Sequence, residues 1–523
     1  MSNRNLSIGR SFWLQTSYLR FQTMRDLEVR TEPEPFLTAS SHRGHVPLSR
    51  ETVRELGTVE PLHQLRQGTH LAPLVKLTTL LHNALGLVRY EYGSVRPFHR
   101  GAPSARCLYS TELYVIPADS DWLGEEGIYR YDPLMHALER IDLHTNWDVL
   151  ENALGRSLAG AEGVLVVGAD FWRIARLYAD FAYNIASLEA GHVIAQLNMI
   201  ATRLGYTPTV HEQFLDQDLM ELLGMNEDVK TPLAVIVLWP QATAGESPKR
   251  ELVRERKLID MASVSTRFER EMNQCADLQQ MMKASRLTSR VELELPEIDS
   301  SGVTEELVHT SASCVELVQR STKSRHPDLL EALKSRNSAN DRIGLNAVGR
   351  PLPFAELSGL LCELAANPEA IELAQEVGLY LAAHRVEGLQ SGIYRCDLSV
   401  PALCTLTVQE DVGRAMERAS VVDGKFINFR SIPLSFYFAV DLERTLQKYG
   451  NRGYQILLMK VGRLAQSLCL LAAARGWFAR PLKSYRDAEA EEMLGIAQST
   501  QIVAYQLVMG ESDTPYLEFD MGL

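Results

Sequence analysis

An apolar strand followed by a long apolar helix is the clearest pattern in the second half of the chain. Residues 432–476 begin with the strand, pass through a polar turn and continue into a helix that is apolar on most of its surface. The first half contains a copy at 164–205, in which seven residues recur at a constant separation of 271. Asp170, Arg173, Tyr178, Tyr183, Gly191, Leu197 and Gly205 reappear as Asp441, Arg444, Tyr449, Tyr454, Gly462, Leu468 and Gly476. We therefore predict two copies of one αβ unit, since a repeat this long indicates a domain duplication and not a solenoid.

Shorter patterns predict the other elements and the domain boundaries. Apolar residues at a spacing near 3.6 predict a helix over 74–85, and a proline begins another at 351–361. Strands are predicted at 112–116, 127–132, 164–168 and 232–239, and again at 378–383, 392–397 and 503–510. We expect an N-terminal extension of helix and irregular chain over 1–50, a first domain over 51–240, a charged helical connector over 241–330 and a second domain over 331–523.

Duplicated domains of this kind pack against each other like the two subunits of a two-fold dimer. Each site at their interface then exists twice, and sequence drift can destroy one copy. The helix start shows such drift, because Lys448 stands beside Tyr449 whereas Leu177 stands beside Tyr178.

Two polar loops also differ between the halves. Arg336, Asn337 and Ser338 precede the first helix of the second domain, where a cation, an amide and a hydroxyl suit a phosphate. The first-half counterpart, 66–69, has no serine in register. Conversely, Pro103 and Ser104 form a loop before a strand that only the first half contains. Each half therefore retains a different part of a site.

Composition limits the class of protein. The length of 523 residues exceeds one ordinary core, and 46% apolar with 23% charged residues is typical of a folded soluble protein. A net charge of −13 argues against a nucleic-acid partner. No apolar run approaches the roughly 18 residues of a membrane span, and the first residues lack the apolar segment of a secretory signal. The seven cysteines are scattered, so we expect them to be reduced core residues of a cytoplasmic protein.

Several other chemistries lack support in the sequence. The histidines at His63, His70 and His211 do not have metal-ligand spacing, so no metal site is expected. No glycine-rich turn of the nicotinamide-binding type follows a strand. His192 lies on an apolar helix and is expected to be a hydrogen-bonded core histidine.

The order of these motifs resembles the FMN-dependent nitroreductase superfamily, and within it the SagB-type azoline dehydrogenases. The resemblance depends on Arg-x-Ser at 336–338, the Pro-Ser loop at 103–104 and a Gly-x-Tyr-x-x-Asp strand in both halves. Lys-Tyr before Arg-Gly-Tyr at 448–454, and Glu-Ala-Gly-His at 189–192, are similar to the family's helix pattern. The resemblance implies an α+β fold in tandem, each copy with a mixed or antiparallel sheet and helices on both faces, forming an intramolecular pseudo-dimer.

The resemblance also implies one composite FMN site. Arg336, Asn337 and Ser338 would hold the FMN phosphate, while Pro103 and Ser104 would meet the isoalloxazine across the interface; Arg452 is a further cofactor-binding candidate. The chain departs from the family at Arg106, where glycine is usual, and at Asn340, where a second arginine is usual. A basic pair after the last strand is missing from 511–523.

The expected chemistry assigns roles to Lys448 and Tyr449. Aromatising an azoline removes a proton from Cα and a hydride equivalent that flavin accepts. Lys448 can act as the base only if its pKa falls toward neutrality, for which Arg452 is the candidate neighbour; Tyr449 would bind the ring heteroatom or relay the proton. The alternative is that Lys448 is a solvated helix-start residue and Tyr449 a core aromatic.

The expected activity is therefore FMN-dependent oxidation of a thiazoline or oxazoline, in a peptide or on a carrier protein, to a thiazole or oxazole, with dioxygen as the electron acceptor. A cyclodehydratase or a peptide synthetase is a candidate partner, and a homodimer of the chain is compatible with this. Two other functions stay open. A general nitroreductase or ene-type flavin reductase would prefer NAD(P)H as donor, and a catalytically decayed scaffold subunit would bind no FMN.

Overall fold

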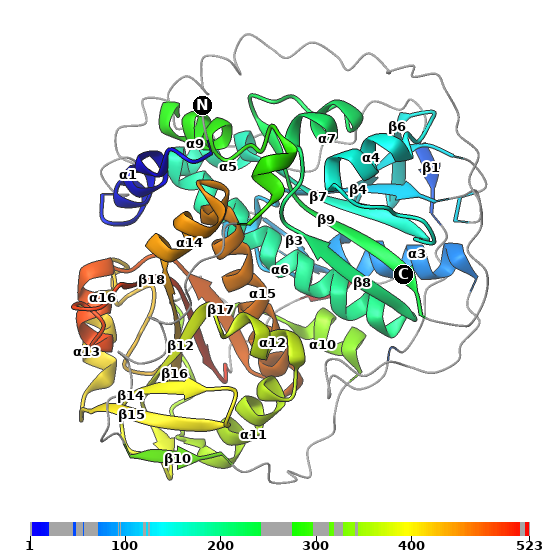
Figure 1. The fold of residues 1–523 in the computed structure, drawn as a ribbon. Coiled ribbons are helices and arrows are strands. Elements are labelled where there is room, and N and C mark those ends of the chain that lie inside the picture. The colour runs from blue at the N-terminus through cyan, green and yellow to red at the C-terminus, as the bar shows by residue number, and fades with distance from the viewer. Residues whose placement is uncertain are drawn as a thin grey trace.

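The computed structural model describes residues 3–19, 45–48, 56, 72–92, 94, 96–118, 122–123, 126–241, 275–295, 313–317, 328–339, 344–512 and 518–521. These residues form two sheets with a pair of long helices between them (Figure 1). The predicted counterpart at 66–69 and Asn340 lie outside the described residues.

The two large sheets have the same strand order, and each is antiparallel throughout. The first runs β1 (His45–Pro47), β6 (Ala137–Asp142), β5 (Ile128–Asp132), β4 (Thr111–Pro117), β7 (Gly163–Asp170), β9 (Lys230–Pro240) and β8 (Tyr206–His211). The second runs β10 (Cys314–Glu316), β15 (Ala402–Val408), β14 (Gly392–Asp397), β12 (Val377–Ala383), β16 (Leu434–Asp441), β18 (Gln501–Gly510) and β17 (Phe478–Leu482). The predicted duplication of an α+β unit is confirmed.

The helices repeat in the same way. Equivalent pairs are α1 (Leu6–Ser17) and α9 (Ala276–Ala284), α3 (Pro73–Leu85) and α11 (Phe354–Ala365), α4 (Trp147–Leu154) and α13 (Val412–Ala419), α5 (Phe171–Tyr178) and α14 (Leu442–Tyr449), α6 (Ala182–Arg203) and α15 (Arg452–Ala474), and α7 (Asp216–Leu222) and α16 (Asp487–Leu494). The others are α10 (Leu329–Ser335), α12 (Pro368–Leu373), and the 3₁₀ turns η1 (Ala105–Cys107), η2 (Ala179–Phe181) and η3 (Arg290–Leu293).

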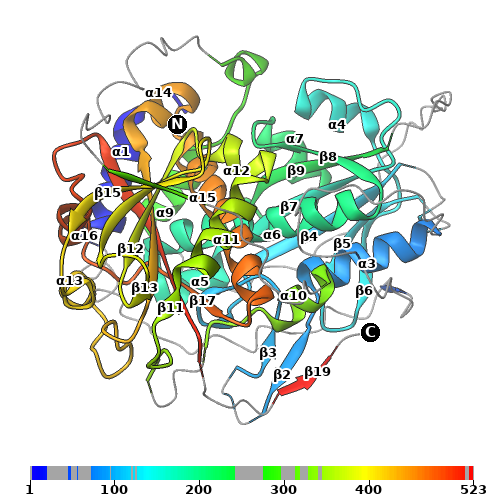
Figure 2. The ribbon, with the colours of Figure 1, turned by 90° about the horizontal axis from the view of Figure 1, so that it is seen from below.

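Short strands join parts that are distant in the chain. The strand β19 (Glu518–Asp520) pairs with β2 (Arg89–Glu91), which pairs with β3 (Phe98–His99), as seen from below in Figure 2. The strands β11 (Leu352–Pro353) and β13 (Val386–Glu387) form a parallel pair. The C-terminal strand of the second half is thus part of a sheet in the first half.

The predicted polar turn before the long helix is wrong, because 442–449 forms α14. Leu442, Leu446 and Tyr449 are buried on one face at helical spacing, and the other face is charged. The Asp441 side chain caps this helix by accepting a hydrogen bond from the Arg444 amide at 2.9 Å. The many polar residues of this short amphipathic helix give it the composition of a turn.

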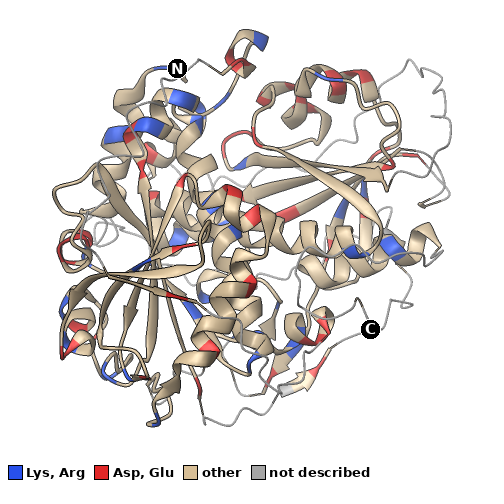
Figure 3. Ribbon diagram, turned by 60° about the horizontal axis from the view of Figure 1, so that its bottom comes forward, with Lys and Arg blue, Asp and Glu red and all other residues tan. Residues whose placement is uncertain are grey.

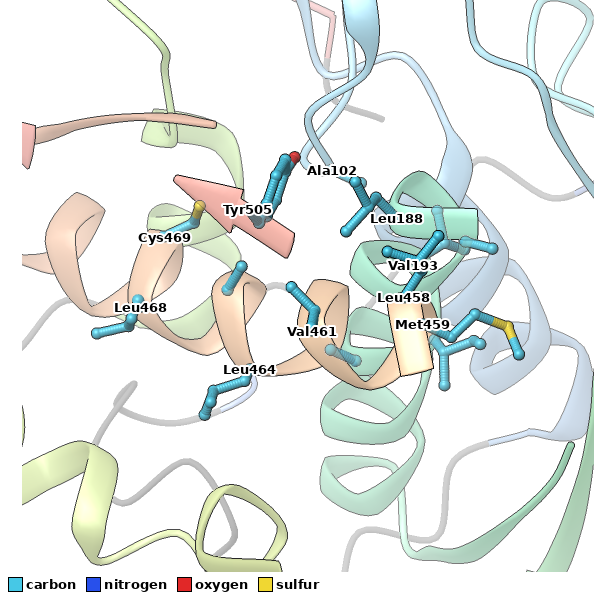
Figure 4. Close-up of a cluster of buried hydrophobic side chains, with 14 of the residues drawn as sticks. Ala102, Leu188, Val193, Leu458, Met459, Val461, Leu464, Leu468, Cys469 and Tyr505 are labelled. Carbon is cyan, nitrogen blue, oxygen red and sulfur yellow. The ribbon is translucent and has the colours of Figure 1, made fainter. Parts of the chain in front are cut away.

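The helices α6 and α15 cross at two glycines in the centre of the molecule. A Cβ on Gly191 would lie 2.2 Å from the Met459 carbonyl, and a Cβ on Gly462 would lie 2.3 Å from the Leu188 carbonyl. One apolar core contains side chains of both halves around this crossing (Figure 4), and smaller cores cover the outer face of each sheet. Helices therefore lie on both faces of each sheet, as predicted.

Hydrogen bonds beside this crossing show the pseudo-two-fold symmetry directly. The Tyr183 hydroxyl donates to Gln455 Oε1 at 2.7 Å, and the Tyr454 hydroxyl donates to Asn184 Oδ1 at 3.0 Å. Tyr183 and Tyr454, like Asn184 and Gln455, are 271 residues apart. The predicted pseudo-dimer therefore follows from the two repeats and their exchanged contacts.

Helix α1 packs on the second half, although it belongs to the start of the chain. The Gly9 amide donates to Asn451 Oδ1 at 2.9 Å, and the Thr16 hydroxyl lies 3.0 Å from the Tyr454 hydroxyl. Just before this helix, the Asn3 side chain donates a hydrogen bond to the Tyr449 carbonyl and accepts one from the Arg452 amide.

Helix α9 makes the equivalent contacts with the first half. The Leu278 amide donates to Asp180 Oδ1 at 2.7 Å, and the Ser285 hydroxyl lies 2.9 Å from the Tyr183 hydroxyl. The two arms, α1 and α9, are thus exchanged between the repeats. The boundaries at 51, 241 and 331 stay a prediction, and the matched α1 and α9, like β1 and β10, favour a division in which each repeat starts with its own arm.

The expectation that all seven cysteines are reduced is wrong for one pair. Cys314 in β10 lies directly opposite Cys404 in β15, and the two form a disulfide. The other five are free, and Cys275, Cys396 and Cys469 among them are buried.

Helix α15 is long and apolar enough, by length and composition, to cross a membrane, and it is the one such helix among the described residues. Most of it is buried in the core between the sheets. In the described parts of the chain, basic and acidic residues are interspersed over the helices and loops (Figure 3).

The glycine crossing predicts a large effect of one methyl group. The substitution Gly462→Ala should lower the free energy of unfolding by about 2–3 kcal/mol, because backbone atoms of α6 occupy the space of the new Cβ. Gly349→Ala is the control, since the nearest atom to its Cβ is 4.0 Å away. Denaturant unfolding of both variants measures this, and equal stabilities would contradict a close backbone contact.

The exchanged arms predict a pH dependence of stability. Burial raises the pKa of Asp180 to about 6, with the Leu278 amide opposing that rise, while the equivalent Asn451 is neutral. The folded protein therefore binds a proton that the unfolded chain releases, and stability falls as pH rises from about 4 to 6. Asp180→Asn should gain about 2 kcal/mol above pH 6 and nothing near pH 4. Asn451→Asp should show the reverse, and melting curves across pH that coincide with the wild type would refute this assignment.

Candidate functional site

The two loops singled out in the sequence meet at the interface of the halves. Helix α10 ends at Ser335, and the next side chain, Arg336, is buried. Its Nη1 donates to the Ser338 hydroxyl at 3.1 Å, and its Nη2 donates to the Arg100 carbonyl at 3.3 Å. Arg100 lies three residues before Pro103, so the structure brings the Arg-x-Ser and Pro-Ser segments together.

Arg336 and Arg100 are two buried cations at this interface, and the Arg336 guanidinium contacts the backbone carbonyl of Arg100. They are 5% and 3% exposed, and neither has an ion pair with an acid among the described residues. The Nε atom of each has no hydrogen-bond partner there. Burial lowers the pKa of both guanidinium groups, and Arg100 lies 4.3 Å from the centre of the Tyr109 ring. A desolvated guanidinium that makes no ion pair, such as that of Arg336, suits a bound anion.

The loop that carries Pro103 and Ser104 is fixed from one side. The Ser104 hydroxyl donates to Glu189 Oε2 and accepts the Tyr109 amide at 2.9 Å. Glu189 Oε1 in turn accepts from the Thr111 amide and hydroxyl, both at 2.9 Å. Helix α6 therefore positions the Pro-Ser loop through a single carboxylate.

The same loop has a left-handed backbone at three residues. Arg106, Cys107 and Tyr109 have φ of +51°, +52° and +51°. Glycine adopts this conformation without cost, whereas other residues are strained in it. The departure from the family at Arg106 therefore falls where glycine has a physical advantage.

Side chains of α6, α15 and β18 lie under this loop. His192 is fully buried, with Nδ1 2.8 Å from Gln466 Oε1 and Nε2 3.4 Å from the Tyr505 hydroxyl. Burial lowers the pKa of His192 to about 3, so the ring is neutral. Figure 4 shows Tyr505 beside Cys469 and near Ala102. His192 is a hydrogen-bonded core histidine, as expected.

Sequence reasoning missed Arg100, Gln466 and Tyr505. Arg100 had a detectable signal, since it stands three residues before the Pro-Ser loop. Tyr505 had none, because the position 271 residues earlier is Ala234 in an ordinary buried strand. Only the fold shows that β18 reaches α6 of the other half.

Lys448 and Tyr449 lie in a different charge network. Lys448 Nζ donates to Glu376 Oε1 at 3.0 Å and is 4.8 Å from the centre of the Tyr449 ring. Lys460 also donates to Glu376 and is 5.5 Å from that ring. Burial opposes the charge, but hydrogen bonds to Tyr449 and Glu376 and the field of Glu376 raise the pKa of Lys448. This direction is opposite to the lowered pKa that Lys448 would need to act as the base.

This network lies near the start of α15, whereas Arg336 lies near its end. Lys460 and Cys469, which contact the two regions, are nine residues apart on the helix, or about 13 Å along its axis. No contact joins Lys448 to Arg336 among the described residues. Lys460 and Arg463 occupy the positions equivalent to Glu189 and His192, so ion pairs fill the region where the first half has a serine loop.

Arg452 and Asn337 have other partners. Arg452 is fully buried and donates from Nη1 to Asp216 Oδ1 at 2.6 Å and from Nε to the Glu212 carbonyl at 3.0 Å. Arg452 therefore joins the two halves. Its hydrogen bonds go to neither Lys448 nor Arg336. The Asn337 carbonyl accepts the Ala479 amide at 3.0 Å and shapes the turn after α10.

Within the described ranges, no group of three or more His, Cys, Asp or Glu side chains is arranged to hold a metal ion. His63 and His70 lie outside those ranges.

Comparisons with known proteins agree with this geometry. A family model described as the nitroreductase family matches residues 72–238 and 349–511, one match for each repeat. The protein "Putative nitroreductase MJ1384" of Methanocaldococcus jannaschii is 33% identical over 127 residues, which are 24% of this chain and 64% of that protein. The match thus spans less than two thirds of that relative.

Solved structures give the same fold. A crystal structure of a putative nitroreductase from Anabaena variabilis superposes with a TM-score of 0.72 at 20% identity, over 96% of this chain and 99% of that chain. A chain of the Escherichia coli microcin synthetase McbBCD complex, with truncated pro-MccB17 bound, aligns at 19% identity over 45% of this chain and 92% of its own. Its TM-score of 0.29 supports no argument. Since the family model covers both repeats and more than half of the residues, the chain belongs to the nitroreductase family.

Proposed function

We propose that this chain is an FMN-dependent oxidoreductase with one composite flavin site at the interface of its two halves. Members of the nitroreductase family are flavin-dependent oxidoreductases, and both repeats of this chain match the family. The site combines Arg336, Asn337 and Ser338 of the second half with the loop 99–109 of the first half.

The observation that supports this proposal is the buried guanidinium of Arg336, which has no ion pair with an acid among the described residues. Burying a guanidinium without an acid costs several kcal/mol, at least until an anion binds. A phosphate matches the donor geometry of a guanidinium, and the Ser338 hydroxyl beside Arg336 adds a donor. The FMN phosphate is the anion that these residues would hold.

The protein groups would orient and protect the cofactor. FMN, when bound, would accept the hydride equivalent that leaves the substrate. Ser104 and Pro103 would position the ring system, since Glu189 and the Tyr109 amide fix the Ser104 hydroxyl. The apolar crossing of α6 and α15 would exclude water from beneath it.

The substrate class we propose is an azoline ring, a thiazoline or oxazoline, in a peptide or on a carrier protein. The ordered motifs at 103–104, 189–192 and 336–338 support it, since they resemble the SagB-type azoline dehydrogenases. The product would be the aromatic thiazole or oxazole, dioxygen the electron acceptor, and a cyclodehydratase or peptide synthetase the supplier of the ring. We propose a cytoplasmic location for this reaction.

Flavin counting tests the proposal. The purified chain should contain about one FMN per chain, and Arg336→Ala should weaken FMN binding about tenfold to a hundredfold, as expected for the loss of a hydrogen-bonded cation. Arg350→Ala is the control, since Arg350 is exposed and pairs with Glu511. Thermal melts of both variants should match the wild type, which checks that folding is unaffected.

The outcome also separates the rival functions. If the purified protein binds no added FMN, the oxidoreductase function is refuted and the scaffold function is the one that remains. Two FMN per chain would mean that the region of Lys460 and Arg463 is also a flavin site. If FMN is bound, but only NAD(P)H with nitroaromatics or enones supports turnover and a thiazoline peptide does not, the general reductase is the correct function.

A further inference from the structure

We propose that Arg106 and Tyr178 form the substrate-facing pair of the composite site, in place of Lys448 and Tyr449. This inference rests on the proposed function, because it names the residues that would face the substrate beside FMN. It also explains how a flavin site can work at the interface that lacks the Lys-Tyr sequence.

Tyr178 is the structural equivalent of Tyr449. The two are 271 residues apart, and each is the last residue of equivalent helices, α5 and α14. The position equivalent to Lys448 is Leu177, so α5 brings the tyrosine but no cation at the preceding residue.

A cation reaches Tyr178 from another element. The Cζ atom of Arg106 lies 5.8 Å from the centre of the Tyr178 ring, whereas Lys448 Nζ lies 4.8 Å from the Tyr449 ring. Both distances are within the range of cation–π attraction. The halves therefore both place a cation over this tyrosine, one from the helix and one from the loop.

The Arg106–Tyr178 pair adjoins the composite site. Arg106 stands two residues after Ser104, and the next residue, Cys107, is close enough to Arg336 for the guanidinium to lower the pKa of its thiol against the larger effect of burial. Arg106 itself is exposed, and Tyr178 is half-buried beside it. Lys448 is at the other end of α15.

The loop before the central strand carries charges of opposite sign in the two halves. In the second half the loop before β12 supplies an acid, Glu376, which holds Lys448 and Lys460 in ion pairs. In the first half the loop before β4 supplies the cation, Arg106. Lys448 is thus committed to a carboxylate, whereas Arg106 has no ion pair with an acid in the described ranges.

The backbone makes the presence of Arg106 informative. Its φ and ψ of 51° and 27° suit glycine, and arginine there costs about 1 kcal/mol. Cys107 and Tyr109 of the same loop share this conformation, and Arg106 is the one of the three whose side chain is exposed.

Arg106 and Tyr178 would have different roles in the reaction. A guanidinium is always charged and only donates hydrogen bonds, so Arg106 would bind the ring heteroatom and stabilise negative charge that develops on it. The azoline would lose one proton from Cα, which the Tyr178 hydroxyl would relay to solvent water, and one hydride from the adjacent ring carbon. FMN, when bound, would supply the hydride acceptor, and dioxygen would take up the two electrons with the transferred hydrogen and one proton from solvent, and leave as hydrogen peroxide.

Substitutions that separate stability from rate test the pair. Arg106→Gly should keep FMN bound, leave the melting temperature equal or higher, and lower the oxidation rate of a thiazoline peptide at least tenfold. Tyr178→Phe should give a similar loss, and Arg106→Lys should restore part of the rate. Lys448→Met is the matched control and should stay within about twofold of the wild-type rate. Full rate in Arg106→Gly, or loss of rate only in Lys448→Met, would overturn the pair.

A second readout needs no substrate. A tyrosine in contact with a flavin quenches its fluorescence by electron transfer, whereas phenylalanine does not. Tyr178→Phe should therefore lengthen the fluorescence lifetime of bound FMN, and Tyr449→Phe should not. An unchanged lifetime in Tyr178→Phe overturns the inference even if no azoline is oxidised, while failure of the wild type to bind FMN refutes the proposed function itself.

Discussion

The close contact of α6 and α15 at Gly191 and Gly462 is the constraint on which the rest of the structure depends. Any side chain there would collide with the backbone of the facing helix, so the two helices approach as closely as backbones allow. This approach fixes the separation of the two sheets. It also places His192 of one helix beside Gln466 of the other, so one helix crossing builds both sides of the interface.

A crossing of this kind creates two equivalent regions, and the chain treats them differently. Around Ser104 the carboxylate of Glu189 accepts hydrogen bonds from Ser104 and Thr111, and the buried Arg336 and Arg100 make no ion pair among the described residues. In the equivalent region Lys460 and Arg463 are neutralised by Glu376 and Glu369. The first environment suits a bound anion, and the second is complete without one. Duplication within one chain permits this difference, which two identical subunits cannot develop.

The sequence predicted the fold well, because the repeat at 271 residues and the strand patterns are local signals. It could not predict the exchanged arms, since Gly9 and Leu278, or Thr16 and Ser285, make equivalent contacts without being identical. The disulfide depended on strand register, which cysteine spacing does not reveal. Arg336 and Ser104 were found from motifs. The environment of Lys448 was not, because its partner Glu376 is 72 residues away and only the fold brings them together.

The exchanged arms have a consequence for how the protein is made. The contact between Thr16 and Tyr454 joins residues 438 positions apart, so the part of the α1 docking surface that the second half supplies is made only when almost the whole chain has left the ribosome. At synthesis rates of about 5–20 residues per second, the docking of α1 stays incomplete for roughly 20–90 seconds. During that time Phe12 can pack on Tyr183, whereas Trp13 lacks its ring contact with Tyr454 and is available to chaperones or to another nascent chain. Pairing of two nascent chains through these arms is the expected misassembly of this architecture.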